Sequence, residues 1–420
     1  MRLRLLAFPL PALLAAAVIS ASPGPRPRDG HFESIASFAV EGAEDGSVAE
    51  IVAATPNGKL LVYTDSEGER VGFVEIDDPA HPVQTSVLDM GGSPTSVAIT
   101  RHGRYALVAV SGTDDLAVVR LSTREIVRRI PLGGQPDCVA VSPDGFYAAI
   151  AIENERDEDV NDGEMPQAPA GYLVIVDLLG EPKHWATREV ELTGIAARFP
   201  DDPEPEFVDI RSDNVAALTL QENNHIVLID LKTGGIVGGF PAGTSTHAAD
   251  LENDDVVSFT DTLTDARREP DGIVWTPGGR LATANEGDYD LDLGPGEFVG
   301  GRDFSIFRLN GTVLFQPGVS LEKAAADAGF YDDGRSDNAG CEFEGVTIGD
   351  YGRRPYLFVG SERCAFVGVY NLADEANPVL LQLLPTGDRP EGLLAIPGRD
   401  LFVTANEGDG TLSIFRFEQD

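Results

Sequence analysis

The chain has 420 residues, 69 of them acidic and 31 basic, which gives a formal net charge of −38 at pH 7. A surface this acidic repels phosphate backbones and anionic lipid headgroups. Nucleic acids and membrane surfaces are therefore poor candidates as partners. The apolar fraction of 42% supplies a substantial core, while 46 glycines and 28 prolines favour short strands and turns. The acidity also fits a generic salt-adapted surface or the binding of multivalent cations.

The N-terminus has the pattern of a secretory signal peptide. Two arginines precede an apolar stretch over residues 5–19, and Ser20 and Ala21 are small enough for cleavage nearby. The stretch is broken by two prolines and is short for a membrane span. We predict a signal peptide over residues 1–21, a flexible tether over 22–30, and a secreted or periplasmic protein without a transmembrane segment.

Seven copies of one unit follow the tether. In each copy an acidic or proline-flanked start leads into an apolar strand, a Gly-containing turn, a second strand that ends in polar residues, and a third strand such as HIVLIDL over 225–231. Repeats of this length with three or four strands are typical of β-propellers. We therefore predict an all-β fold, a single seven-bladed β-propeller over residues 31–420, with one short inserted helix over 321–329. The strand ESIASFAVEG (33–42) is expected to join the last blade and close the ring.

Alignment of the copies places acidic residues at two repeated positions, the start of the first strand and the end of the second. Both positions lie at the same face of a propeller, beside the central channel. Glutamate is uncommon in strands and is not a turn former, so its repetition needs another cause. The start position holds Glu50, Asp137, Glu206, Asp271, Glu344 and Glu391, with Thr95 in the second copy, and the end position holds Glu67, Glu153, Glu222, Glu286, Glu362 and Glu407.

These twelve carboxylates are candidate metal ligands. Packed like charges raise one another's pKa and repel unless a cation neutralises them. Ca²⁺ accepts carboxylates, amide carbonyls and water in flexible geometry, so Ca²⁺ is the expected cofactor. The alternative is a solvated acidic funnel with occasional partners such as Arg363 and Arg389. Paired histidines with zinc-ligand spacing and nucleophile motifs are absent from the sequence, so no catalytic residue is predicted.

The hexapeptide Thr-Ala-Asn-Glu-Gly-Asp occurs twice, at residues 283–288 and 404–409. We interpret its Asn, Gly and Asp as residues of the turn that leaves the second strand. The turn does not require Glu286 or Glu407, so these two belong to the ring of acids.

Three cysteines are too few for a disulfide scaffold. Cys341 and Cys364 flank adjacent predicted strands, so we expect one bridge between them in an oxidising compartment. Cys138 is then expected to be a free, buried thiol.

Several long segments also resemble a known family. They are QPDCVAVSPDG (135–145), EPEFVDI with LTLQENNHIVLIDL (204–231), LATANEGDYD (281–290), YDDGRSDNAGCEFEGVTIG with FVGSER (331–363), and RPEGLLAIP with FVTANEGDGTLSIF (389–415). These segments are similar to the choice-of-anchor I family of secreted bacterial β-propellers with YVTN/WD40-like repeats, whose members are often described as alkaline-phosphatase-like. The family usually continues into an anchoring segment that this sequence lacks, which favours a soluble form.

Two functions are compatible with these features. The first is a metal-dependent hydrolase, phosphatase- or phytase-like, in which Ca²⁺ on the rim neutralises a phosphate ester or other small-molecule substrate. The second is a non-catalytic, calcium-stabilised surface or extracellular binding protein. A lactonase-type hydrolase would use the same metal. In each case we expect a monomer.

Overall fold

The computed structural model describes residues 30–154, 160, 165–286 and 300–419. The predicted signal peptide (1–21) and the tether up to residue 29 lie outside the described residues, as do Gly287 and Asp288 of the first hexapeptide. Within the described part of the chain, no helix is long and apolar enough to cross a membrane.

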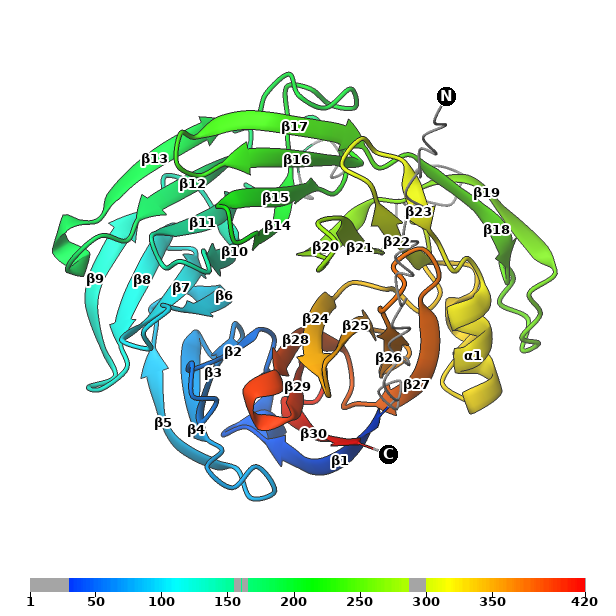
Figure 1. The fold of residues 1–420 in the computed structure, drawn as a ribbon, viewed down its shortest axis with the longest axis horizontal. Helices are drawn as coiled ribbons and strands as arrows, with labels where there is room; N and C mark the ends of the chain where they lie inside the picture. The colour runs from blue at the N-terminus through cyan, green and yellow to red at the C-terminus, as the bar shows by residue number, and fades with distance from the viewer. Residues whose placement is uncertain (1–29, 155–159, 161–164, 287–299, 420) are drawn as a thin grey trace, which may run out of the picture.

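Seven four-stranded antiparallel sheets surround a central channel as the blades of a propeller (Figure 1). This confirms the predicted fold. In each blade the first strand lies innermost. The blades are blade 1, β2 (Val52–Ala54), β3 (Leu60–Asp65), β4 (Arg70–Glu75) and β5 (Val83–Asp89); blade 2, β6 (Ser93–Ile99), β7 (Tyr105–Ser111), β8 (Asp115–Arg120) and β9 (Glu125–Pro131); blade 3, β10 (Pro136–Val141), β11 (Tyr147–Ile152), β12 (Tyr172–Asp177) and β13 (Ala186–Glu191); blade 4, β14 (Pro205–Ile210), β15 (Val215–Leu220), β16 (His225–Asp230) and β17 (Gly235–Pro241); blade 5, β20 (Pro270–Trp275), β21 (Leu281–Asn285), β22 (Asp303–Phe307) and β23 (Val313–Phe315); blade 6, β24 (Val346–Tyr351), β25 (Arg354–Ser361), β26 (Phe366–Asn371) and β27 (Val379–Pro385); and blade 7, β28 (Pro390–Ile396), β29 (Leu401–Asn406), β30 (Thr411–Gln419) and β1 (Gly30–Ala39).

The N-terminal strand closes the ring, as the sequence predicts. β1 pairs antiparallel with β30 from Gly30 opposite Gln419 to Ala39 opposite Thr411. Phe32, 2% exposed, anchors this strand with its ring edge-on to Tyr351 at 5.0 Å between ring centres. The last sheet therefore joins the first and the last strand of the described chain, which removes an open edge from β30.

The core lies between neighbouring blades. The second and third strands of each blade are covered by a blade on either side, so their side chains are buried on both faces. β7, with the sequence YALVAVS, is buried over Tyr105–Val110. This is why the second and third strands appear in the sequence as continuous apolar runs instead of alternating ones.

Two insertions flank blade 5. One is the hairpin β18 (Thr244–Ala249) and β19 (Asp261–Arg267), and the other is helix α1 (Ser320–Ala328), which ends at Gly329 with φ 81°. A fully buried arginine joins the hairpin insertion to the loop after the helix: Arg302 donates to the carbonyls of Asp250 and Ser336, each at 2.9 Å. The predicted helix is thus confirmed, together with its role as the element preceding blade 6.

The predicted disulfide is present. Cys341 and Cys364 are bonded, with an S–S distance of 2.01 Å. Cys138 is free and buried, also as predicted. The bridge ties the loop that enters blade 6 to the turn after β25.

Candidate functional site

The first strands deliver their acids to the channel through a repeated backbone irregularity. β10, β14, β20 and β28 each begin with a proline, and the pairing register with the second strand shifts directly after it. Proline has no N–H to donate, so it suits the first position of a strand, and the irregularity re-aims the next side chain. That next residue is the acid in every case: Asp137, Glu206, Asp271 and Glu391. β6 shows the same shift after Pro94, with Thr95 in the acid's place.

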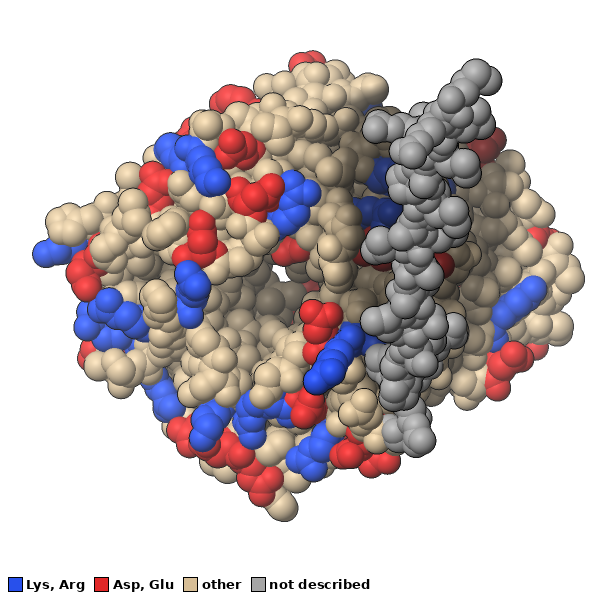
Figure 2. All heavy atoms as spheres, viewed as in Figure 1, with Lys and Arg blue, Asp and Glu red and all other residues tan. Residues whose placement is uncertain are grey.

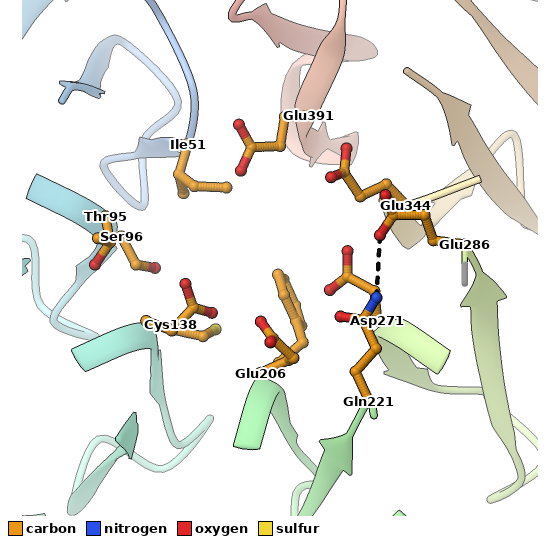
Figure 3. Close-up of a pocket in the computed structure, with 13 residues that line it drawn as sticks. Ile51, Thr95, Ser96, Cys138, Glu206, Gln221, Asp271, Glu286, Glu344 and Glu391 are labelled. Atoms are coloured by element: carbon orange, nitrogen blue, oxygen red, sulfur yellow. Dashed lines mark hydrogen bonds between the residues drawn. The ribbon is translucent and has the colours of Figure 1, made fainter. Parts of the chain in front are cut away.

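The acids converge on a cavity of about 220 Å³ in the channel. The face drawn in Figure 2 is hollowed at its centre, and acidic side chains lie beside the opening. Figure 3 shows carboxylates from different strands pointing inward around the cavity. Six of the twelve predicted ligands line it: Asp137, Glu206, Asp271, Glu286, Glu344 and Glu391.

Three groups of carboxylates have oxygen atoms within 4.8 Å of one another. Seven of the twelve predicted ligands belong to these groups, and the other five are Glu50, Glu67, Glu222, Glu391 and Glu407. We name the groups by their position around the ring. The first group is Asp137, Glu153 and Glu206, the second is Asp271, Glu286 and Glu344, and the third is Glu286, Glu342 and Glu362.

Strand register corrects the predicted end position in two blades. Pro270 pairs with Asn285 and Pro205 with Leu220, so Gln221 is the residue equivalent to Glu286. Glu222 therefore comes one residue later than the alignment of the sequence assumed. Gln221 lines the cavity and donates a hydrogen bond to Glu286 at 3.2 Å.

The same offset applies in blade 1. β3 ends at Asp65, so Ser66 occupies the position that faces the channel, and Glu67 follows it as an exposed residue. Glu67 belongs to none of the three groups of carboxylates, although its charge acts on Glu50. Ser66 instead donates a hydrogen bond to Glu50.

The remaining predicted ligands lie around the three groups. Glu222 is 8% exposed, and its charge acts on Glu206 and Asp271. The charge of Glu50 acts on Glu391, and the charge of Glu407 acts on both.

Glu342 is a member of the third group that the sequence analysis missed. It lies two residues before Glu344, and the repeat alignment admitted one acid at this position of each unit. Arg363 Nε lies 2.5 Å from a carboxylate oxygen of Glu342, and Arg335 bonds to the other oxygen. The sequence CEFEG (341–345), with two glutamates separated by one residue, could have indicated Glu342 as a further ligand.

Arginines neutralise part of the charge on this side of the ring. Arg363 Nε is also 3.0 Å from Glu362, and Arg389 lies 3.9 Å from Glu362 and 3.7 Å from Glu407. Arg363 and Arg389 are thus the partners that the sequence suggested. The cavity lining itself contains no lysine or arginine among the described residues.

Burial raises the pKa of five of the six carboxyl groups that line the cavity. The pKa values of Glu206, Asp271, Glu286 and Glu391 lie well above their ordinary values, first because of burial and then because of neighbouring carboxylates. The same causes raise the pKa of Glu344 to about 7.

Two further carboxyl groups beside the cavity are affected in the same way. Burial raises the pKa of Glu362 to about 9 and that of Glu50 to about 7. The ring therefore holds its full negative charge near neutral pH only if a cation stabilises it.

The repeated hexapeptide has a different local role from the one predicted. Asn285 and Asn406 are fully buried strand residues, so their assignment to the turn is wrong. Thr283 donates to Asn285 Oδ1 at 2.8 Å, and Asn285 Nδ2 donates to Ser305 Oγ at 2.9 Å.

The second copy repeats this network. Thr404 donates to Asn406 at 2.9 Å, and Asn406 donates to Ser413 at 3.0 Å. Each asparagine therefore fastens the end of the second strand to the third strand. The next residue, Glu286 or Glu407, is held in place at the channel as a result.

Comparisons with known proteins agree with the fold. The structure superposes on a chain of hydrazine synthase from Kuenenia stuttgartiensis with a TM-score of 0.61 and 17% identity, covering 89% of this chain and 96% of that one. It also superposes on catalytically inactive virginiamycin B lyase from Staphylococcus aureus with quinupristin, with a TM-score of 0.61 and 12% identity, covering 92% and 99%. Identities this low show a shared propeller fold and nothing about activity. No curated protein matches the sequence.

The family comparison is more specific. The choice-of-anchor I domain matches residues 50–294 and 293–375. These segments extend from blade 1 to the third strand of blade 6 and include the loop that carries Glu342 and Glu344. Since they make up most of the sequence, the chain belongs to the choice-of-anchor I family.

Proposed function

We propose that this protein is an exported propeller that binds Ca²⁺ in its channel, at the second group of carboxylates. One observation carries the proposal: Asp271, Glu286 and Glu344 bring oxygens within 4.8 Å of one another, and Oε2 of Glu344 is buried without a hydrogen-bond partner. Oxygens on opposite sides of a Ca²⁺ ion lie about 5 Å apart, because each is bonded at about 2.3–2.6 Å. The spacing and the unsatisfied oxygen together suit a hard cation.

The second group is a better candidate than the third. In the third group, Arg335 and Arg363 already neutralise Glu342. Among the described residues, no lysine or arginine forms an ion pair with the second group: Arg363 and Arg389 attract Glu344 only from a distance, and the amide of Gln221 donates to Glu286. A divalent ion would therefore relieve more repulsion at the second group.

Calcium suits the site better than the other common divalent ions. The donors are carboxylates from three different strand ends, with space for water beside them, and Ca²⁺ tolerates such irregular sets. Mg²⁺ requires a near-ideal octahedron and gives up its water reluctantly. Zinc prefers nitrogen and sulfur ligands, which the three groups do not supply.

A metal-dependent phosphoesterase is the second candidate function, in line with the alkaline-phosphatase-like description of the family. It is favoured by the position of Arg363 beside the third group, which shares Glu286 with the second. A bound Ca²⁺ would act as a Lewis acid and offset the negative charge of a phosphate ester. Guanidinium groups nearby could hold two phosphate oxygens at once. Without catalysis, the same site would make the protein a calcium-stabilised surface or extracellular binding protein.

The test uses the purified chain after removal of metal with a chelator. Calcium binding is measured by titration calorimetry, stability by thermal unfolding, and hydrolysis with p-nitrophenyl phosphate. We expect Ca²⁺ to bind and to raise the melting temperature, Glu344→Gln to weaken both effects, and Glu67→Gln to change neither. An absence of calcium binding would refute the proposal. Binding without hydrolysis would leave the non-catalytic function and exclude the phosphatase.

A further inference from the structure

The channel cavity has an acidic side and an apolar side. Its volume of about 220 Å³ is several times the roughly 30 Å³ that one water molecule occupies in the liquid, so a single metal ion leaves most of it open. Ile51, Cys138 and Phe207 line it together with the carboxylates. Burial also raises the pKa of the Cys138 thiol, which keeps this part of the lining uncharged. A pocket of this kind suits a cation that has an apolar portion.

Five of the six acids that line the cavity belong to two groups that act on each other; Glu153 completes the first group from outside the lining, and Glu391 belongs to neither group. The first group comes from blades 3 and 4, and the second from blades 5 and 6. The charge of Asp271 raises the pKa of Glu206, and that of Asp137 raises the pKa of Asp271. The two groups therefore present two concentrations of negative charge to one cavity.

Each group has the geometry of an ammonium site. A protonated primary amine has three N–H donors and no acceptor. Three acceptor oxygens at about 2.8 Å from such a nitrogen lie about 4.6 Å from one another. The oxygens of each group lie within 4.8 Å of one another, so they can accept all three donors.

We propose that the cavity binds a linear aliphatic diamine. One ammonium group lies in the first group of carboxylates and the other in the second, where the buried Oε2 of Glu344 lacks a hydrogen-bond partner. The methylene chain between them passes over Phe207 and Cys138. An aromatic ring beside a cationic alkyl chain contributes both apolar contact and cation–π attraction.

This ligand would compete with the proposed Ca²⁺ for the second group but not for the first. The two proposals therefore fail separately. Calcium binding without amine binding overturns the diamine proposal alone, and amine binding without calcium binding overturns the calcium proposal alone.

The experiment measures binding to the metal-free chain by titration calorimetry at fixed ionic strength. The probes are 1,4-diaminobutane, 1,5-diaminopentane and 1,6-diaminohexane, with butylamine and hexylamine as single-charge controls. We expect one length of diamine to bind at least about tenfold more tightly than either monoamine, since the second ammonium binds intramolecularly. Added Ca²⁺ should lower the affinity for the diamine, and it should leave the affinity of the first group for a monoamine nearly unchanged.

Variants separate this site from general attraction to an acidic protein. Phe207→Leu keeps an apolar side chain and should weaken the diamine by about fivefold without changing calcium affinity. Glu206→Gln should lower the affinity for diamines and for monoamines alike. Glu67→Gln, at an exposed residue, should change neither affinity. Equal affinity for diamines and monoamines in the unmutated chain would overturn the proposal, as would equal losses in Glu67→Gln and Glu206→Gln. The comparison of probes on the unmutated chain is decisive even if a variant does not fold.

Discussion

Replacing Glu344 with Gln should stabilise the metal-free protein at alkaline pH and destabilise the calcium-bound one. Glutamine has the shape and neutrality of a protonated glutamate, so the substitution removes only the charge. Burial and neighbouring carboxylates raise the pKa of Glu344 from 4.5 to about 7. Since one pKa unit corresponds to about 1.4 kcal/mol, ionisation of this group in the folded chain lowers the free energy of unfolding by up to about 3 kcal/mol.

The sign of the pH dependence follows from which state holds the proton. Folded Glu344 binds its proton more tightly than the unfolded chain does, so its contribution to stability is complete below pH 4.5 and is lost as the pH rises to about 7. In chelator, Glu344→Gln should therefore match the unmutated chain at low pH and exceed it by up to about 3 kcal/mol at pH 8.

Calcium should reverse this order. A ligand at 1,000 times its dissociation constant stabilises the folded state by about 4 kcal/mol, which is more than the charge removal gains. The assay is urea unfolding followed by circular dichroism, at pH 5 and pH 8, in chelator and in excess Ca²⁺. Glu67→Gln is the matched control, because Glu67 is exposed. A Glu344→Gln variant that is less stable than the unmutated chain in chelator at pH 8 would refute the argument about burial.

Three further predictions concern the fold and its supports. Asn285→Ala and Asn406→Ala should each lower the free energy of unfolding by about 1–3 kcal/mol, because each leaves buried partners unsatisfied; urea unfolding measures this, and unequal effects would contradict the shared network. Phe32→Ala should cost about 3–5 kcal/mol and expose β1 to proteolysis before the other blades; cleavage that begins elsewhere would argue against closure by this strand. Reducing the Cys341–Cys364 bridge, which spans a sequence separation of 23, should lower the free energy of unfolding by about 3 kcal/mol. Thermal unfolding with and without reductant measures this difference, and equal stability in the two conditions would contradict the prediction.

The repeat in the sequence was sufficient to predict the fold because every blade buries the same two strands. A strand covered on both faces appears in the sequence as an apolar run such as YALVAVS. Few folds other than a propeller contain seven such runs at similar intervals. Closure could be predicted because the last unit lacks a fourth strand and the apolar ESIASFAVEG precedes the first unit.

The site was predictable in position but not in detail. The turn residues of the sequence align Glu67 with Glu286, whereas the backbone pairing places Ser66 at that position. The sequence analysis missed Glu342 as a member of the third group, because an alignment of repeats identifies only the positions that the units share. Which acids approach one another depends on the irregular starts of the first strands, whose geometry is a property of the assembled sheet.

Closure by β1 and β30 also sets the order in which the molecule can be completed. The strands of all seven blades lie between Gly30 and Gln419 in the sequence, so this pairing forms only after every blade has been synthesised. Until then β30 presents an unpaired edge, and contacts between such distant residues form slowly. At high concentration the missing strand can be supplied by another copy, so refolding from dilute solution should give monomers and refolding from concentrated solution should give strand-exchanged dimers.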